Sequence, residues 1–273
     1  MPGFTHDAFR TLAAGLEVDR LLAEEPDCPV FGLNLACAWP FPGAGGEAYA
    51  RFYRYLGRLR SWAYVYPPEQ THITLVTFLN FLRHRRPTDD WLLDVEGRVQ
   101  IVQQKLDGLL RRTGGTVGTG GDHDPGHGRD GNSRSDGVGG SGDEGRLPRA
   151  FVLDEPEFCL VPKAGFLRFR DVEGRVAEIR AALRGWLNED REIGGWVEAG
   201  GLNIPGIVHS TCVRFIGRPS EDATERALSV RALNEASEVA SAIRIEVDEL
   251  LLTTETKPYM RGGACLARWK LGA

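Results

Sequence analysis

Apolar and polar positions along the chain alternate between two periods, one helical and one extended. Apolar residues recur three and four positions apart in several long stretches. Shorter runs rich in β-branched and aromatic residues, typical of strands, lie between them. The expected helices fall within 1–28 and over 47–60, 91–112, 172–187 and 219–240, and the expected strands at 31–39, 62–66, 71–78, 150–153, 157–161, 166–170, 207–215, 243–253 and 264–271.

One long segment, 113–148, departs from this pattern. It is rich in Gly, Asp, Ser and Arg and nearly free of large apolar side chains, so it cannot bury enough surface to offset its ordering entropy. We expect a disordered Gly-rich insertion in a single bilobal domain that spans residues 1–273. The acidic and histidine residues of 122–127 lack the rigid support that metal ligands need, so they do not predict a metal site.

Composition and charge exclude several classes of function. A chain of 273 residues with 42% hydrophobic residues can build a sizeable core. The net charge of −5 argues against a broad basic surface for duplex DNA. No stretch approaches the ~20 apolar residues of a membrane span. Five scattered cysteines without a C-x-x-C pair predict neither disulfides nor a zinc cluster. We expect a monomer in the cytoplasm, with the nucleus as the alternative.

Two of the predicted strands carry a histidine followed two residues later by a threonine. His72 and Thr74 share one face of the first strand, and His209 and Thr211 share one face of the second, because strand side chains alternate. A single histidine on a strand is usually a core or surface residue. The repeat of the pair in apolar runs, in opposite halves of the chain, favours a functional interpretation instead.

This arrangement suits cleavage of a phosphodiester. In-line displacement needs a base on the attacking oxygen and an acid on the leaving oxygen. Two imidazoles with an ordinary pKa near 6.5 can serve as both, one neutral and one protonated. The threonine hydroxyls can bind the non-bridging phosphate oxygens. The design requires no metal or other cofactor, and it leaves open which histidine is the base.

The segments His72-Ile73-Thr74-Leu75 and His209-Ser210-Thr211-Cys212 resemble the paired H-x-T-x motifs of the 2H phosphoesterase superfamily. That group includes the RNA 2′,3′-cyclic phosphodiesterases, also called the 2′-5′ RNA ligase family. The resemblance implies an α+β, bilobal fold in which two antiparallel-sheet lobes with outer helices enclose a central groove. It also implies that His72 and His209 are the acid–base pair and that Thr74 and Thr211 bind phosphate. Cys212 departs from the aliphatic residue that is usual there.

Three further residues are weaker candidates for base stacking or for lining the groove: Tyr66, Tyr259 and Asn34. Tyr259 lies in the polar loop 255–263, and the resemblance implies a tyrosine there that stacks on a base; Tyr66 is also consistent with an ordinary strand aromatic. We therefore expect hydrolysis of a cyclic 2′,3′-type or a 2′-5′ phosphodiester in a small nucleotide or at an RNA end, with RNA ligation as a related activity. The alternatives are a non-catalytic nucleotide- or RNA-binding module that uses the same groove, and a scaffold protein with core histidines.

Overall fold

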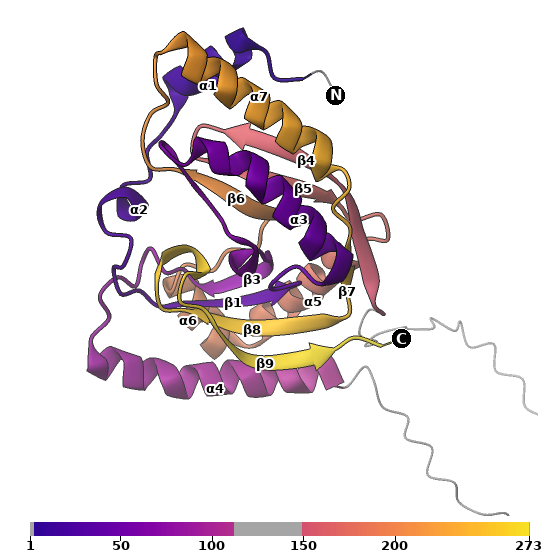
Figure 1. Cartoon of the computed structure of the whole chain (residues 1–273). Coiled ribbons are helices and arrows are strands. Elements are labelled where there is room, and N and C mark those ends of the chain that lie inside the picture. The colour runs from indigo at the N-terminus through magenta and orange to yellow at the C-terminus, as the bar shows by residue number, and fades with distance from the viewer. Residues whose placement is uncertain (1–2, 112–148, 273) are drawn as a thin grey trace, which may run out of the picture.

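Two antiparallel sheets form the body of the molecule (Figure 1). The structure is a computed structural model and describes residues 3–111 and 149–272. The predicted insertion at 113–148, including 122–127, therefore lies outside the described residues.

The first sheet has four strands in the order β3-β1-β8-β9, and the second has five in the order β2-β6-β5-β4-β7. The strands of the first sheet are β1 (Gly32–Cys37), β3 (Ile73–Leu79), β8 (Glu249–Glu255) and β9 (Ala264–Lys270). Those of the second sheet are β2 (Ala63–Val65), β4 (Phe151–Val161), β5 (Ala164–Arg170), β6 (His209–Phe215) and β7 (Ile245–Val247).

The two sheets do not correspond to the two halves of the chain. β2 comes from the N-terminal half but pairs with β6 in the second sheet. β8 comes from the C-terminal half but pairs with β1 in the first sheet. Each sheet is therefore complete only when both halves of the chain have contributed strands.

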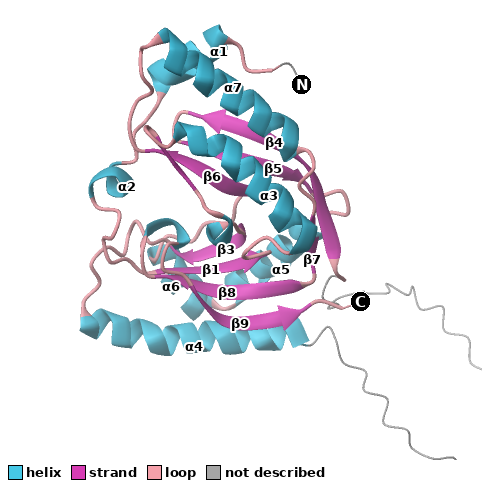
Figure 2. Ribbon diagram, in the orientation of Figure 1, coloured by secondary structure: helices cyan, strands magenta, loops and turns pink. Residues whose placement is uncertain are grey.

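Helices cover the outer faces of both sheets (Figure 2). Above the second sheet, α3 packs against α7 and α1 lies beside α7; α4 runs along the first sheet, and α5 and α6 pack against β3. Their bounds are α1 (His6–Gly15), α2 (Arg20–Glu24), α3 (Gly43–Leu56), α4 (Asp89–Arg111), α5 (Arg175–Glu189), α6 (Arg191–Ala199) and α7 (Ala223–Ala240).

Several local expectations are wrong. The strands expected at 150–153 and 157–161 form one strand, β4, and the single strand expected at 243–253 is divided between β7 and β8. The first 28 residues form two short helices instead of one, because Asp19 caps a new helix by accepting from the Leu22 amide. The stretch 191–199, for which no helix was expected, forms α6, since Asp190 caps it and Ile193 lies buried within it. Gly194 is needed there, because a Cβ would lie 2.3 Å from the Leu187 carbonyl oxygen.

The core includes residues of both sheets and of the helices that cover them. Aromatic side chains of α3 fill its centre: Tyr49 contacts Phe41, and Phe52 meets Phe158 of β4 edge to face at 5.1 Å. The predicted fold class is confirmed, since two antiparallel sheets with outer helices make up the described chain. Among the described helices, none is long and apolar enough to cross a membrane.

Candidate active site

A pocket of about 220 Å³ lies between the two sheets and contains both histidine motifs. β3 and the residue before it supply one motif, and β6 supplies the other. All seven residues singled out in the sequence line this pocket: Asn34, Tyr66, His72, Thr74, His209, Thr211 and Tyr259. Residues from positions 34 to 259 thus meet at one place because the sheets interleave the two halves of the chain.

A β-bulge follows the threonine in each motif strand. In β3, Ala36 pairs with Thr74 and Leu35 with Val76, so Leu75 is an extra residue. In β6, Phe166 pairs with Thr211 and Gly165 with Val213, so Cys212 is the extra residue. An extra residue reverses the alternation of side chains beyond it.

The bulges bring a third residue of each strand to the pocket. Thr77 and Arg214, each five positions after its histidine, line the pocket together with the histidine and the threonine. Strict alternation places them on the opposite face, so neither residue was predicted from the sequence. The signal for a bulge was present as two successive apolar residues, Leu75-Val76 in β3 and Cys212-Val213 in β6, which are buried in both strands.

Both imidazoles are oriented by backbone carbonyl groups. Nδ1 of His72 lies 2.8 Å from the Gln70 oxygen, and Nδ1 of His209 lies 3.5 Å from the Ile207 oxygen. A carbonyl can only accept, so this contact assigns the proton of the neutral ring to Nδ1 and leaves the lone pair on Nε2. The rings of Phe166 (β5) and His209 pack edge to face, with their centroids 5.5 Å apart, and this contact restricts the His209 ring.

Burial lowers the pKa of both histidines below the usual value near 6.5. For His72 the Gln70 carbonyl opposes this effect, and the charge of His209 adds to it. For His209 the Ile207 carbonyl opposes it, and the cations Arg180 and Arg214 add to it. Each imidazole therefore prefers to be neutral, and an anion bound beside them favours protonation of one ring.

Arg214 gives the pocket a cation with an unused donor. Its buried Nε has no hydrogen-bond partner in the described part of the chain. Its guanidinium lies over the Tyr259 ring, 4.8 Å from the ring centroid. Buried donors are usually satisfied, so an orphan donor in a pocket points to a ligand that accepts from it.

A buried carboxyl group forms another part of the pocket wall. Glu255 at the end of β8 accepts from Nδ2 of Asn34 at 2.7 Å and from the Met260 amide at 3.3 Å. Burial raises the pKa of Glu255 to about 7, and these two donors oppose the increase. Glu255 was not predicted from the sequence, because a carboxylate near a loop is ordinarily exposed and only the tertiary structure buries it.

The turn that carries Tyr259 is strained and buried, not the open polar loop that was expected. Tyr259 and Met260 have φ angles of 62° and 60°, a left-handed conformation that costs non-glycine residues roughly 1–2 kcal/mol each. The Tyr259 hydroxyl donates to Asp19. Tyr259 is 9% exposed and Tyr66 only 1%, so the two tyrosines act as pocket wall.

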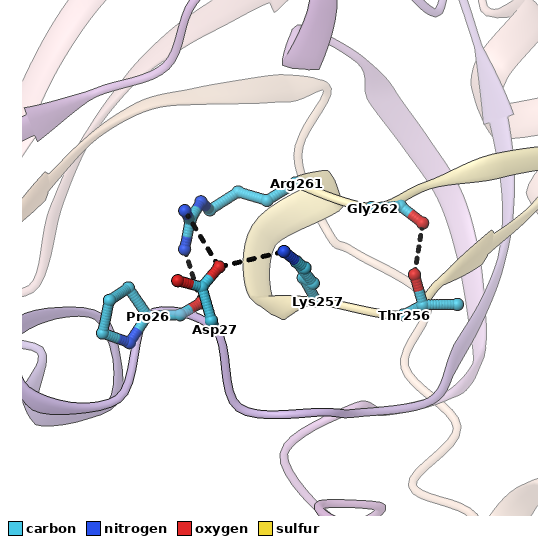
Figure 3. A network of polar contacts seen from close by, with 6 residues as sticks. All are labelled: Pro26, Asp27, Thr256, Lys257, Arg261 and Gly262. Carbon is cyan, nitrogen blue, oxygen red and sulfur yellow. Dashed lines mark hydrogen bonds and ion pairs between the residues drawn. The ribbon is translucent and has the colours of Figure 1, made fainter.

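Ion pairs tie this loop to the segment that follows α2 (Figure 3). Asp27 pairs with Lys257 at 3.0 Å and with Arg261, which also donates to the Pro26 carbonyl. Within the loop, the Thr256 hydroxyl donates to the Gly262 carbonyl at 2.6 Å. Lys257 and Arg261 therefore hold the loop in place through Asp27.

No group of three or more His, Cys, Asp or Glu side chains in the described residues is arranged to hold a metal ion. No protein-family model and no curated protein matches the chain.

Among solved structures, the chain is similar to TT0787 of Thermus thermophilus, with 15% identity and a TM-score of 0.45 over 88% of this chain and 97% of that one. It is also similar to E. coli LigT in apo form, with 13% identity and a TM-score of 0.43 over 90% of this chain and 99% of that one. For E. coli LigT complexed with 3′-AMP, the identity is 12% and the TM-score is 0.41, again over 90% of this chain and 99% of that one. At these values, function has to be argued from the pocket itself.

Proposed function

We propose that the chain is a 2H-type phosphoesterase that hydrolyses a cyclic 2′,3′ or a 2′-5′ phosphodiester by two-histidine acid–base catalysis. The observation that carries this proposal is that His72 with Thr74, and His209 with Thr211, approach one pocket from two different sheets. The same pocket contains Arg214 with its unused donor. We further propose that the described parts of the chain act as one domain, since a single core joins both sheets.

In the proposed reaction, Nε2 of one neutral histidine removes a proton from water, and the water oxygen attacks phosphorus. The bond from phosphorus to the ribose oxygen on the opposite side breaks, and the other, protonated histidine donates its proton to that oxygen. The carbonyl contacts at Nδ1 hold each ring so that Nε2 faces the substrate. In ligation, a hydroxyl of a second RNA end takes the place of water: one histidine removes its proton, its oxygen attacks the phosphorus of the 2′,3′-cyclic phosphate, and the other histidine protonates the ribose oxygen that leaves.

The electrostatics of the pocket support this division of roles. Thr74 and Thr211 can donate to the non-bridging oxygens, and Arg214 can bind the charge that they carry. The charge of His209 lowers the pKa of His72, so protonation of both rings together is disfavoured. A bound phosphate diester with one negative charge therefore favours the state in which one ring is protonated and the other is neutral.

The size of the pocket favours a small substrate. Its 220 Å³ lies below the roughly 300–1,000 Å³ of pockets that enclose a drug-sized ligand. One phosphate and the sugar that it bridges fit such a volume better than a long segment of nucleic acid. A small nucleotide or the terminal 2′,3′-cyclic phosphate of an RNA is the substrate class that we propose.

The test is hydrolysis of 2′,3′-cyclic nucleotides in the presence of EDTA by the full chain and by His72→Ala and His209→Ala. General acid–base groups contribute about 10²–10⁴-fold, so each variant should lose at least about 10²-fold in kcat while its melting temperature stays close to that of the wild type. His84→Ala is the matched control, because His84 is also partly buried and stacks on Trp91 instead of lining the pocket. Turnover that survives in both motif variants contradicts the proposal.

A wild type that binds 2′,3′-cyclic nucleotide but never turns it over points to the binding-module alternative. In that case, both alanine variants should lose binding while the fold is retained.

A further inference from the structure

A buried arginine binds the main chain of β3, the strand that carries the first motif. Arg180 of α5 is 5% exposed and does not line the pocket. Its Nη2 donates to the Thr74 carbonyl at 2.9 Å and its Nε to the Leu75 carbonyl at 3.2 Å. Its hydrogen-bond partners in the described part of the chain are these two main-chain oxygens. No carboxylate is among them.

These two carbonyl groups belong to the β3 bulge. In a regular strand, successive carbonyl groups point to opposite sides, so a single guanidinium could not bind both. The extra residue Leu75 disrupts this alternation, and both oxygens are then available to the same side. The fork of an arginine provides two donors at a fixed spacing, which matches this pair.

The other motif strand has no need of such a contact. β6 lies between β2 and β5, and its bulge is held by strands on both sides: the Tyr66 amide donates to the Cys212 carbonyl at 2.9 Å, and Gly165 of β5 pairs with Val213. β3 is the edge strand of its sheet: β1 pairs with it on one side, and on the other Asn203 bridges it at Thr77. At the bulge itself, Arg180 binds the carbonyl groups in place of a neighbouring strand.

We propose that Arg180 is a positioning residue: by binding the two carbonyl groups of the β3 bulge, it fixes the direction in which Thr74 and Thr77 face the pocket. This inference rests on the proposed function for its consequence in catalysis. Its charge has a second effect, since Arg180 is one of the cations that lower the pKa of His209.

The test compares Arg180→Met, which removes both the fork and the charge, with Arg180→Lys, which keeps the charge and loses the fork. Misplacement of catalytic groups by about 1 Å can reduce turnover about 10²-fold, so Arg180→Met should lose about 10²-fold in kcat on a 2′,3′-cyclic nucleotide with little change in KM. Arg180→Lys should lose about 10-fold in kcat, because one amine cannot replace the fork. Arg184→Met, exposed on the same helix, is the matched control and should resemble the wild type.

Two measurements that need no turnover separate this inference from the proposed function. The Thr77 amide donates to Asn203 just beyond the bulge, and its hydrogen exchange should be at least about 10-fold faster in Arg180→Met than in the control. An NMR titration of His209 should show a higher pKa in Arg180→Met but not in Arg180→Lys, which a purely structural role would not predict.

Exchange at Thr77 and kcat that both equal those of the control in folded Arg180→Met overturn the inference. If Arg180→Met does not fold, Arg180→Lys decides instead: wild-type hydrogen exchange at Thr77 together with a wild-type kcat in that variant overturns the inference. If the wild type hydrolyses no 2′,3′-cyclic nucleotide, the proposed function fails, and exchange at Thr77 with the His209 titration still decides the role of Arg180.

Discussion

β3 and β6 have the same pattern of side chains in different surroundings. Each strand directs a histidine-threonine pair into the pocket and then changes face at a bulge. β3 is an edge strand whose next pocket residue is the neutral Thr77, whereas β6 lies inside its sheet and presents Arg214. In the proposed reaction, the repeated part supplies the two acid–base groups, and the part that differs places the cation Arg214 on the β6 side of the pocket.

Substitution of the residue five positions after each histidine tests the difference between the two strands most directly. Arg214→Met should reduce kcat/KM on a 2′,3′-cyclic nucleotide by about 10²–10³-fold, because removal of one donor to transition-state charge has an effect of that size. Thr77→Val should stay within a few-fold of the wild type. Steady-state kinetics measure both, with Arg218→Met, an exposed arginine outside this pocket, as the control. Equal losses in Arg214→Met and Thr77→Val would show that the asymmetry has no functional meaning.

The threonines test the part of the two strands that is the same. Thr74→Val and Thr211→Val should each lower kcat by about 10–10²-fold, because each removes one hydrogen bond to a non-bridging oxygen and leaves the size of the side chain unchanged. Single-turnover rates on a cyclic nucleotide would measure the losses. A large loss in one variant and none in the other would contradict an equivalent role of the two strands.

Glu255 extends the comparison to the sheets, since the first sheet places a carboxyl group in the pocket and the second a guanidinium. The pKa of Glu255 is about 7, above its ordinary 4.5, so the folded protein binds this proton more tightly than the unfolded chain does. The resulting stabilisation is fully present below about pH 4.5 and is lost as the pH rises through about 7. Between pH 4.5 and 8, the free energy of unfolding of the wild type should fall by roughly 3 kcal/mol relative to Glu255→Gln.

Urea denaturation of both proteins across this pH range measures that difference. A difference that stays constant with pH would show that Glu255 does not titrate as its burial implies.

The smallest expected effect concerns the two imidazoles themselves. Arg214→Gln removes one of the cations that lower the pKa of His209, so the pKa of His209 should rise. One limb of the pH profile of kcat/KM should then move to higher pH: the acid limb if His209 is the base, and the alkaline limb if His209 is the acid. NMR titration of both rings checks this, and His72 is the internal reference. A pKa shift in His72 larger than that in His209 would contradict the conclusion that the charge of Arg214 acts mainly on His209.

The sequence predicted those parts of the site that depend on local alternation. His72 with Thr74 and His209 with Thr211 follow from period two within single strands, as do most of the strands themselves. Thr77 and Arg214 were not predicted, because two successive apolar residues in a strand indicate a bulge only once the pairing of the neighbouring strand is known. Glu255 could not be found, since its pKa comes from burial between elements distant in sequence.

The interleaving of the sheets was also beyond the sequence pattern. Short strands such as β2 pair with whichever edge the tertiary structure offers, and β2 adds to β6 from the far half of the chain. Local signals predicted the elements well, but partners that lie in opposite halves of the chain are chosen by packing.

The interleaving of the strands has a consequence for the order of events during synthesis. β1 and β3 can pair as soon as residue 79 has emerged from the ribosome, but the other neighbour of β1 is β8, which ends at Glu255. β2 likewise waits for β6. Pairing over such separations is slow and leaves strand edges exposed meanwhile. The nascent chain therefore holds both histidine motifs well before it can assemble a pocket, and the pocket becomes complete only after Glu255 and Tyr259 have emerged.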